Sequence, residues 1–325
     1  MKSLLVSKPQ PEPKQGRREN SVNGSDAESF ALARVVLACR GEGQWGSREE
    51  DNSKIDLIFS TNHPWYLRER MLVLGQVKSG SSFGRSLEAG FTLKSSAKRS
   101  ARKTSQSICV VWVDRDLNRI FWAYVHPNSS SGSQDYGEHH RVTPAMAFDL
   151  ARCSAKSGLG PAFGRGIIVS PSPKQLAERR KHALRLYRSA GQTLSPYMGN
   201  IEFTRLGWRH MFRRSRSAKN KSSSIDLIPH LSNLLGHYPS ASSVTAVSYA
   251  IRDGYEYRTC EHLLKFNGIQ LYETHLAQTK PVTAYVRVIE DIRYPCDWAD
   301  RAMLSQAIDR RVVVKSAYYK ENFGG

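Results

Sequence analysis

Four apolar runs between residues 54 and 126 limit the fold more than any other feature of the sequence. KIDLIFS, MLVLGQVKS, ICVVWVD and IFWAYVH are rich in β-favouring residues and are separated by polar or turn-like segments. A helix is predicted before them in AESFALARVVLACR, with Asp26 as its N-cap, and a closing helix after them in RVTPAMAFDLARCSAKS. This order predicts an α/β core, a mixed sheet flanked by helices.

The second half of the chain predicts a different architecture. PSPKQLAERRKHALRLYRSA has the periodicity of an amphipathic helix, and SIDLIPHLSNLL predicts a helix interrupted at Pro229. Several β-favouring runs between residues 244 and 292 alternate with turn dipeptides and predict an antiparallel meander. DWADRAMLSQAI is expected to form a helix and RRVVVKSAYY a last strand. We therefore expect a C-terminal α+β domain.

The length of 325 residues favours two domains over one. We expect a disordered tail at 1–24, an α/β domain at 25–160, a linker with a basic amphipathic helix at 161–200, and the α+β domain at 201–325. No apolar run approaches the roughly 20 residues that span a bilayer, and the N-terminal segment does not resemble a secretory signal, so a cytoplasmic protein is expected. The five cysteines include no CxxC pair and suggest neither a disulfide framework nor a zinc site.

The net charge of +19 is the most informative bulk property. Segment 68–103 has nine Lys and Arg against two acids, and segment 165–221 has fourteen against two. Such clusters predict a nucleic-acid partner, although a solvated surface or, for RRSRSAKNKSSS, a flexible linker fits as well. The candidate nucleic-acid contacts are Arg85, Lys94, Lys98, Arg99, Arg102, Lys103, Arg209, Arg213 and Arg214.

Asp56, Gln76 and Lys78 form the pattern with the clearest chemical meaning. Asp56 belongs to one predicted strand, and Gln76 and Lys78 project from the same face of the next, with Val77 pointing to the core. Asp56, the Gln76 amide oxygen and the backbone carbonyl of Val77 could bind Mg²⁺ or Mn²⁺, and Lys78 could orient the attacking water and stabilise the transition state. Taken singly, an Asp at a strand start is more often a cap and a strand Lys a surface charge.

KIDLIFS, then VLGQVKSG, then the paired runs around VDRDLNRIF resemble the restriction-endonuclease-like domains described as DUF4365, in the PD-(D/E)XK superfamily. The resemblance covers roughly residues 26 to 155. It implies a restriction-endonuclease-like core, a Mg-dependent endonuclease activity, DNA as the partner, and a role in defence or in a mobile element. It also implies Glu28 as a further metal ligand. Gln76 stands where the superfamily most often has an acid, which removes one negative ligand.

His210, Ser316 and Tyr318 suggest a second site. His210 lies in GWRHMFRRSRS beside several arginines, and a His with Arg can cleave RNA without a metal. In architecture the C-terminal half resembles ribonucleases of the barnase, EndoU and RelE type. The sequence favours a domain that binds nucleic acid, a protein partner or a second copy of the chain over this ribonuclease hypothesis. An inactive nuclease fold that binds nucleic acid without cutting it is the other alternative.

Overall fold

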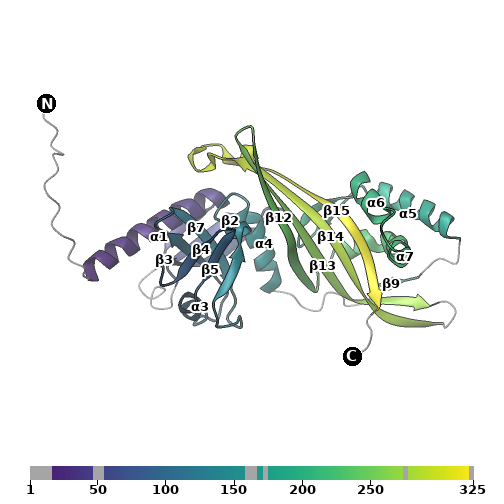
Figure 1. The fold of residues 1–325 in the computed structure, drawn as a ribbon, viewed down its shortest axis with the longest axis horizontal. Helices are drawn as coiled ribbons and strands as arrows, with labels where there is room; N and C mark the ends of the chain where they lie inside the picture. The colour runs from purple at the N-terminus through teal and green to yellow at the C-terminus, as the bar shows by residue number, and fades with distance from the viewer. Residues whose placement is uncertain (1–16, 47–54, 158–166, 171–174, 274–276, 322–325) are drawn as a thin grey trace.

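The computed structural model describes residues 17–46, 55–157, 167–170, 175–273 and 277–321. In Figure 1 the first half of the chain lies at the left, a long twisted sheet in the middle, and a group of helices at the right. No helix among the described ranges is long and apolar enough to cross a membrane.

A five-stranded mixed sheet organises the first half, as the sequence predicts. The strand order is β1-β2-β3-β6-β7, with β3 parallel to β6 and the other pairs antiparallel. Its strands are β1 (Glu42–Trp45), β2 (Leu57–Asn62), β3 (Arg70–Ser79), β6 (Ile108–Asp114) and β7 (Arg119–Val125). β3 is central, and its residues from Gly75 to Val77 are buried, whereas Arg70 and Leu72 near its start are exposed.

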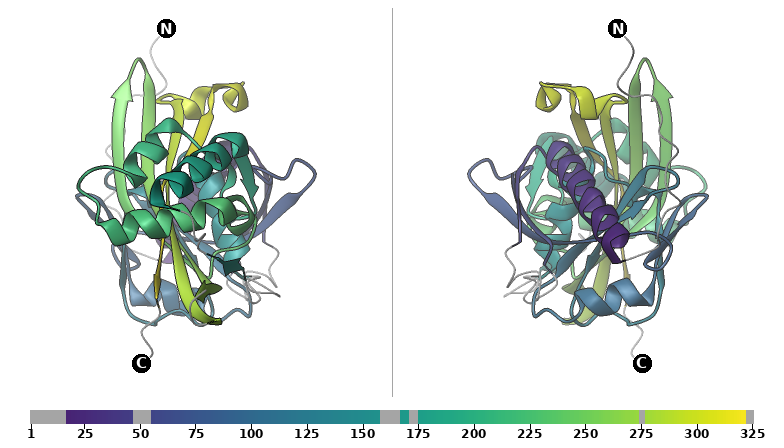
Figure 2. Two further views of the ribbon diagram at one scale, coloured as in Figure 1. Left: turned by 90° about the vertical axis from the view of Figure 1, so that its right-hand side faces the viewer. Right: turned by 90° about the vertical axis from the view of Figure 1, so that its left-hand side faces the viewer.

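Helices cover one face of this sheet. They are α1 (Arg17–Cys39) and α4 (Met146–Ser157), and they share a core with Leu57, Val77 and Val111. α1 crosses this face diagonally in the right panel of Figure 2. α1 begins well before Asp26, so Asp26 is not its N-cap and residues 17–24 of the predicted tail are helical.

A small sheet covers the other face. It has the order β4-β5-β8 and packs together with α3 (Ser95–Ala101), around Phe91, Trp112 and Phe121. Its strands are β4 (Gly84–Leu87), β5 (Gly90–Leu93) and β8 (Gln134–Gly137). β8 lies in the Ser-rich segment between β7 and α4, and it completes this sheet by pairing with β5. The side chains of the central sheet thus lie between helices and a second sheet.

The second half is built on a sheet with the order β10-β11-β15-β14-β13-β12, to which β9 (Ile168–Val169) adds a parallel pair with β13. The strands are β10 (Gln192–Ser195), β11 (Gly199–Glu202), β12 (Ala241–Arg252), β13 (Tyr255–Glu273), β14 (Gln278–Pro295) and β15 (Asp309–Glu321). β12 to β15 pair in sequence as the predicted antiparallel meander. The β10–β11 hairpin has no counterpart in the sequence-based expectation.

Four α-helices and a 3₁₀ turn pack on the core face of the meander. They are α5 (Leu176–Ala190), α6 (Arg205–Met211), α7 (Ala218–Leu227), η2 (Ile228–His230) and α8 (Leu231–Leu235). Most of them lie together in front of the sheet in the left panel of Figure 2. Pro229 lies in η2 and separates α7 from α8 as expected, because its ring prevents one continuous helix. The predicted helix at 297–308 is wrong: the structure has only the 3₁₀ turns η3 (Trp298–Asp300) and η4 (Leu304–Ala307) there.

The two halves meet through a buried charged cluster. Asp149 and Arg152 on α4 contact Arg258 on β13 and Glu290 on β14. Apolar side chains of the helix and the sheet also pack together next to it. Residues 158–166, which include the predicted boundary at 160, lie outside the described residues, and the predicted domain boundaries stay predictions.

Candidate active site

Asp56 lies at the start of β2, directly beside β3. Its backbone N–H donates to the Gly75 carbonyl at 2.9 Å. The strand pairing begins at the next residue, where Leu57 is opposite Gly75. The amide of Val77 lies beyond that pairing and donates instead to Asp56 Oδ2, at 2.7 Å. The carboxylate therefore extends the ladder by one bond, and its position is fixed by the backbone.

The Lys78 ammonium lies between two oxygens. Nζ is 2.9 Å from the Val77 carbonyl oxygen and 3.4 Å from Asp56 Oδ2. The two charged side chains are mostly buried, with 9% of the Asp56 and 17% of the Lys78 side chain exposed. The ring of Phe83 faces the ammonium at 5.8 Å. A cation is thus held by one carboxylate and one carbonyl at the end of β3.

Gln76 lies directly before these groups on β3 and is fully buried. Its partner in the parallel ladder is Val110, whereas Lys78 is opposite Trp112. Val110 and Trp112 belong to the core beneath the small sheet, and Val77 belongs to the core beneath the helices. Gln76 and Lys78 therefore share one face of β3.

Glu28 lies on α1, the helix that packs on β3. It is half-buried. Its role as a metal ligand stays a prediction.

The basic residues chosen from the first half have different environments. Arg85, Arg99 and Lys103 are exposed, and Lys94 and Arg102 are half-buried. The expectation that Lys98 contacts nucleic acid is corrected by its burial, because the residue is fully buried. Its ammonium donates to Ser130 Oγ at 3.1 Å and to Gln134 Oε1 at 2.8 Å. Its helix is short, so the residue turned toward the sheet could not be identified from periodicity.

Two residues near Lys78, Phe83 and Arg115, were not identified from the sequence as candidate site residues. Phe83 lies in a Gly/Ser-rich segment whose sequence predicts neither a helix nor a strand. Arg115 follows β6, is exposed, and hydrogen-bonds to the Ser79 hydroxyl next to Lys78. Because β6 runs parallel to β3, the ends of both strands meet at the same edge. A polar residue directly after the strand beside Lys78 is the signal that could have pointed to Arg115.

The oxygens around Lys78 suit a hard divalent cation. Mg²⁺ and Mn²⁺ prefer carboxylate, carbonyl and water oxygens. Asp56 Oδ2 and the Val77 carbonyl already face one cation, the ammonium, which shows that both can be directed at a positive centre. These two oxygens therefore fit such an ion, with the Asp56 carboxylate as their one negative charge.

A buried group of Cys260, His262 and Glu290 has ligand atoms within 4.8 Å of one another. Glu290 already accepts hydrogen bonds from Arg152 and Arg310. These guanidinium charges oppose a metal cation, so we assign this group a structural role.

His210, Ser316 and Tyr318, the predicted second site, lie around one cavity of about 340 Å³. Arg213 also lines it, whereas Arg209 lines another cavity. Arg214 is exposed.

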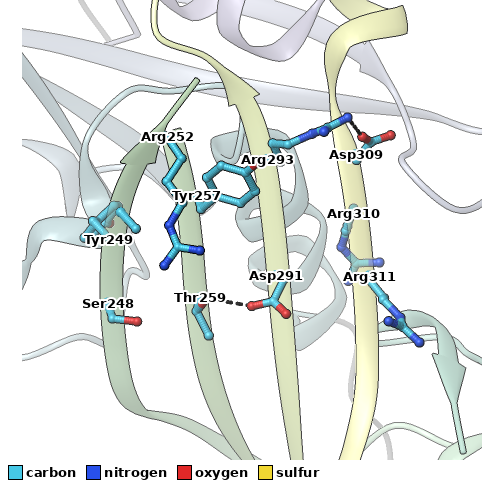
Figure 3. A pocket seen from close by; sticks show the side chains of 11 residues that line it. Ser248, Tyr249, Arg252, Tyr257, Thr259, Asp291, Arg293, Asp309, Arg310 and Arg311 are labelled. Carbon is cyan, nitrogen blue, oxygen red and sulfur yellow. Dashed lines mark hydrogen bonds and ion pairs between the residues drawn. The ribbon is translucent and has the colours of Figure 1, made fainter. Parts of the chain in front are cut away.

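Another cavity, of about 560 Å³, lies on the opposite face of the meander from the helices (Figure 3). Both of its aspartates are engaged, Asp291 with Thr259 and Asp309 with Arg293. None of the residues proposed from the sequence lines it.

Comparison with known proteins gives little further information. No family model matches the chain, and no curated protein matches its sequence. One solved structure, a bacterial homing endonuclease, is similar over 43% of this chain and 98% of its own, with 14% sequence identity and a TM-score of 0.26. A likeness this low does not assign a family or an activity, so the functional argument depends on the residues of this chain.

Proposed function

We propose that this protein is a metal-dependent nuclease that hydrolyses phosphodiester bonds of DNA. One observation carries the proposal: Asp56 Oδ2 and the Val77 carbonyl both face the Lys78 ammonium at the end of β3. Hard oxygen ligands and a cationic side chain at one point suit metal-dependent hydrolysis of a phosphodiester.

The proposed roles follow from the chemistry of each group. Asp56, the Val77 carbonyl, the Gln76 amide oxygen and Glu28 would hold Mg²⁺ or Mn²⁺. When bound, the ion would polarise a phosphate oxygen and acidify a water molecule. Lys78 would orient the attacking water and offset the negative charge that grows on the phosphate. The amide of Val77 keeps Asp56 in place throughout.

Exposed cations in the same half of the protein support a polyanionic substrate. Arg115 is next to Ser79, and Arg85, Arg99 and Lys103 lie on or beside the small sheet and α3. Such charges can neutralise backbone phosphates and release counterions. A role in defence or in a mobile element is part of the proposal and depends on the sequence resemblance alone.

Cleavage of supercoiled plasmid DNA with Mg²⁺ or Mn²⁺ tests the proposal. We expect nicking or linearisation by the wild-type protein and none with EDTA. Lys78→Met keeps most of the side-chain volume and leaves the Val77 bond to Asp56, so it should fold normally and lose roughly 100-fold or more of the activity.

Arg70→Met is the matched control, since Arg70 is an exposed cation at the opposite end of β3 from Lys78. It should retain most of the cleavage. A wild-type protein that binds DNA but cuts nothing with either ion would show that the fold serves binding alone. Equal cleavage by wild type and Lys78→Met would refute the assignment of the active site.

A further inference from the structure

A bulge in β15 creates a cavity beside α6. Arg287 on β14 is opposite Ser316, but Val288 is opposite Val314, so Lys315 is an extra residue in β15. Bulges redirect side chains at the point where they interrupt the ladder. Here Lys315, Ser316 and Arg287 all line the same cavity of about 340 Å³.

Gly207 brings α6 against this bulge. A Cβ atom at Gly207 would lie 2.1 Å from the Val314 carbonyl oxygen and 2.6 Å from the Tyr187 hydroxyl, closer than any side chain tolerates. Thr204 caps the helix by accepting from the Gly207 amide. This close approach holds His210, later on α6, at the edge of the cavity.

The side chains that line the cavity carry more positive charge than the neighbouring carboxylate of Glu261 can balance. Arg287 and Lys315 share the carboxylate of Glu261. Arg213, Arg216 and Lys320 also line the cavity. For these three, no carboxylate of the described ranges lies within ion-pair distance.

Aromatic rings hold two of these cations in place of acids. Arg216 lies over the Tyr318 ring, 5.5 Å from its centroid, and Lys320 over Tyr285, at 5.7 Å. The two rings stack on each other at 5.4 Å. Cation–π contacts order the side chains without neutralising them, so the positive charge stays available to an anion. The same charge, together with burial, lowers the pKa of His210.

Positive charge continues across α6. A neighbouring cavity of about 470 Å³ is lined by Arg180, Arg188, Arg205 and Arg209 together with aromatic residues. None of these four arginines has an ion pair within the part of the chain that the structure describes. Cations spread over two adjacent cavities match the repeated phosphates of a strand better than one free phosphate.

We propose that the β15 cavity binds a backbone phosphate of a single nucleic-acid strand, through Arg213, Arg216 and Lys320, with His210 and Ser316 as hydrogen-bonding groups. Helix α6 contributes His210 to this cavity, and in Figure 1 α6 and β3 lie toward opposite ends of the long axis. The strand site is therefore separate from the proposed nuclease site and binds without a metal ion.

The test is fluorescence anisotropy with a labelled single-stranded oligonucleotide, DNA and RNA in turn, in EDTA and in the Lys78→Met background. These conditions remove the contribution of the proposed nuclease centre, so failure of one proposal does not imply failure of the other. Arg213→Ala with Lys320→Ala should weaken binding at least tenfold. The slope of log affinity against log salt should fall by about 0.7 for each lost phosphate contact.

Arg252→Ala with Arg311→Ala is the matched control, because it removes two exposed cations from the cavity of Figure 3. This control should bind within twofold of the parent. Equal loss in both double variants would overturn the site, since it would show a general effect of net charge. Binding of inorganic phosphate by the parent without binding of either oligonucleotide would also overturn it, because the site would then serve a free phosphate.

Discussion

The guanidinium of Arg152 and the carboxylate of Glu290 form a two-bonded pair between the halves of the protein. Nη1 donates to Oε1 at 2.8 Å and Nη2 to Oε2 at 2.9 Å, and both side chains are buried. Arg152 belongs to α4, which packs on the five-stranded sheet, and Glu290 belongs to the meander. Paired geometry of this kind is rigid as well as strong, so it fixes the two sheets relative to each other.

Glu290→Gln should destabilise the protein strongly. Glu290 also receives hydrogen bonds from His262 and Arg310, and the surrounding cations hold its pKa well below the usual range. Removing the charge leaves Arg310 without its carboxylate and leaves Arg152 and Arg258 with Asp149 alone, which costs about 3–5 kcal/mol. Denaturation by urea measures the loss. The control Glu202→Gln breaks an exposed pair with Arg311 and should cost less than about 1 kcal/mol; similar losses in both variants would contradict this account.

Acidification should destabilise the protein through His140. Burial lowers the pKa of His140 to about 3, and its Nδ1 contacts the Trp122 carbonyl oxygen at 2.9 Å. The folded state therefore binds a proton less readily than the unfolded state. Neutral His140 therefore contributes to the free energy of unfolding. This contribution is complete above the unfolded-state pKa of about 6.5, and it decreases as the pH falls toward the pKa of the folded state.

Between about pH 7 and about pH 5, protonation of His140 in the unfolded state should lower the free energy of unfolding by roughly 1–2 kcal/mol. The free energy of unfolding, measured in urea across this range, gives the slope. His140→Gln should make the slope shallower, whereas His182→Gln, at an exposed position of α5, should leave it unchanged. An unchanged slope in His140→Gln would remove His140 as the cause.

The elements that the sequence predicted are those with strong local patterns. The runs that contain Asp56 and Lys78 became β2 and β3, and the interruption at Pro229 was correct. β4, β5 and β8 were missed because each is four residues long and lies in Gly- or Ser-rich segments that only the tertiary contacts order. The buried cluster around Glu290 was also missed, since its members come from α4, β13, β14 and β15, and no local pattern links them.

Lys98 and Lys103 should respond to mutation in opposite ways. Lys98 is buried on α3, and its hydrogen bonds reach Ser130 and Gln134, whereas Lys103 is exposed. Lys98→Ala should lower the free energy of unfolding by about 1–3 kcal/mol through lost contacts and hydrogen bonds. Lys103→Ala should weaken duplex DNA binding with little change in stability. Urea denaturation and a DNA mobility shift, applied to both variants, check the contrast; a specific loss of DNA affinity in a fully stable Lys98→Ala would contradict the structure.

Asp56→Asn should remove metal binding by the folded protein. Mn²⁺ that binds only the native state raises its melting temperature by mass action, and EDTA should reverse the rise. The amide keeps an oxygen that can accept from Val77, but it lacks the negative charge that the proposed site depends on. Asp116→Asn, an exposed acid in the β6–β7 turn, should retain the wild-type shift. A full shift in Asp56→Asn would place the ion elsewhere.

Gln76→Glu tests whether the neutral ligand limits the site. Gln76 is fully buried, so a carboxylate there should make the metal-free protein less stable, because an ionised or protonated acid replaces an amide in a dry core. The same charge should strengthen binding of Mn²⁺, since affinity for hard cations rises with the number of negative ligands. We therefore expect a lower melting temperature in EDTA and a larger rise with Mn²⁺ than in wild type. Calorimetric titration gives the affinity directly. If Gln76→Glu lowers the stability but binds Mn²⁺ no more tightly, the residue at position 76 does not face the ion, and Asp56, the Val77 carbonyl and Glu28 must form the site without it.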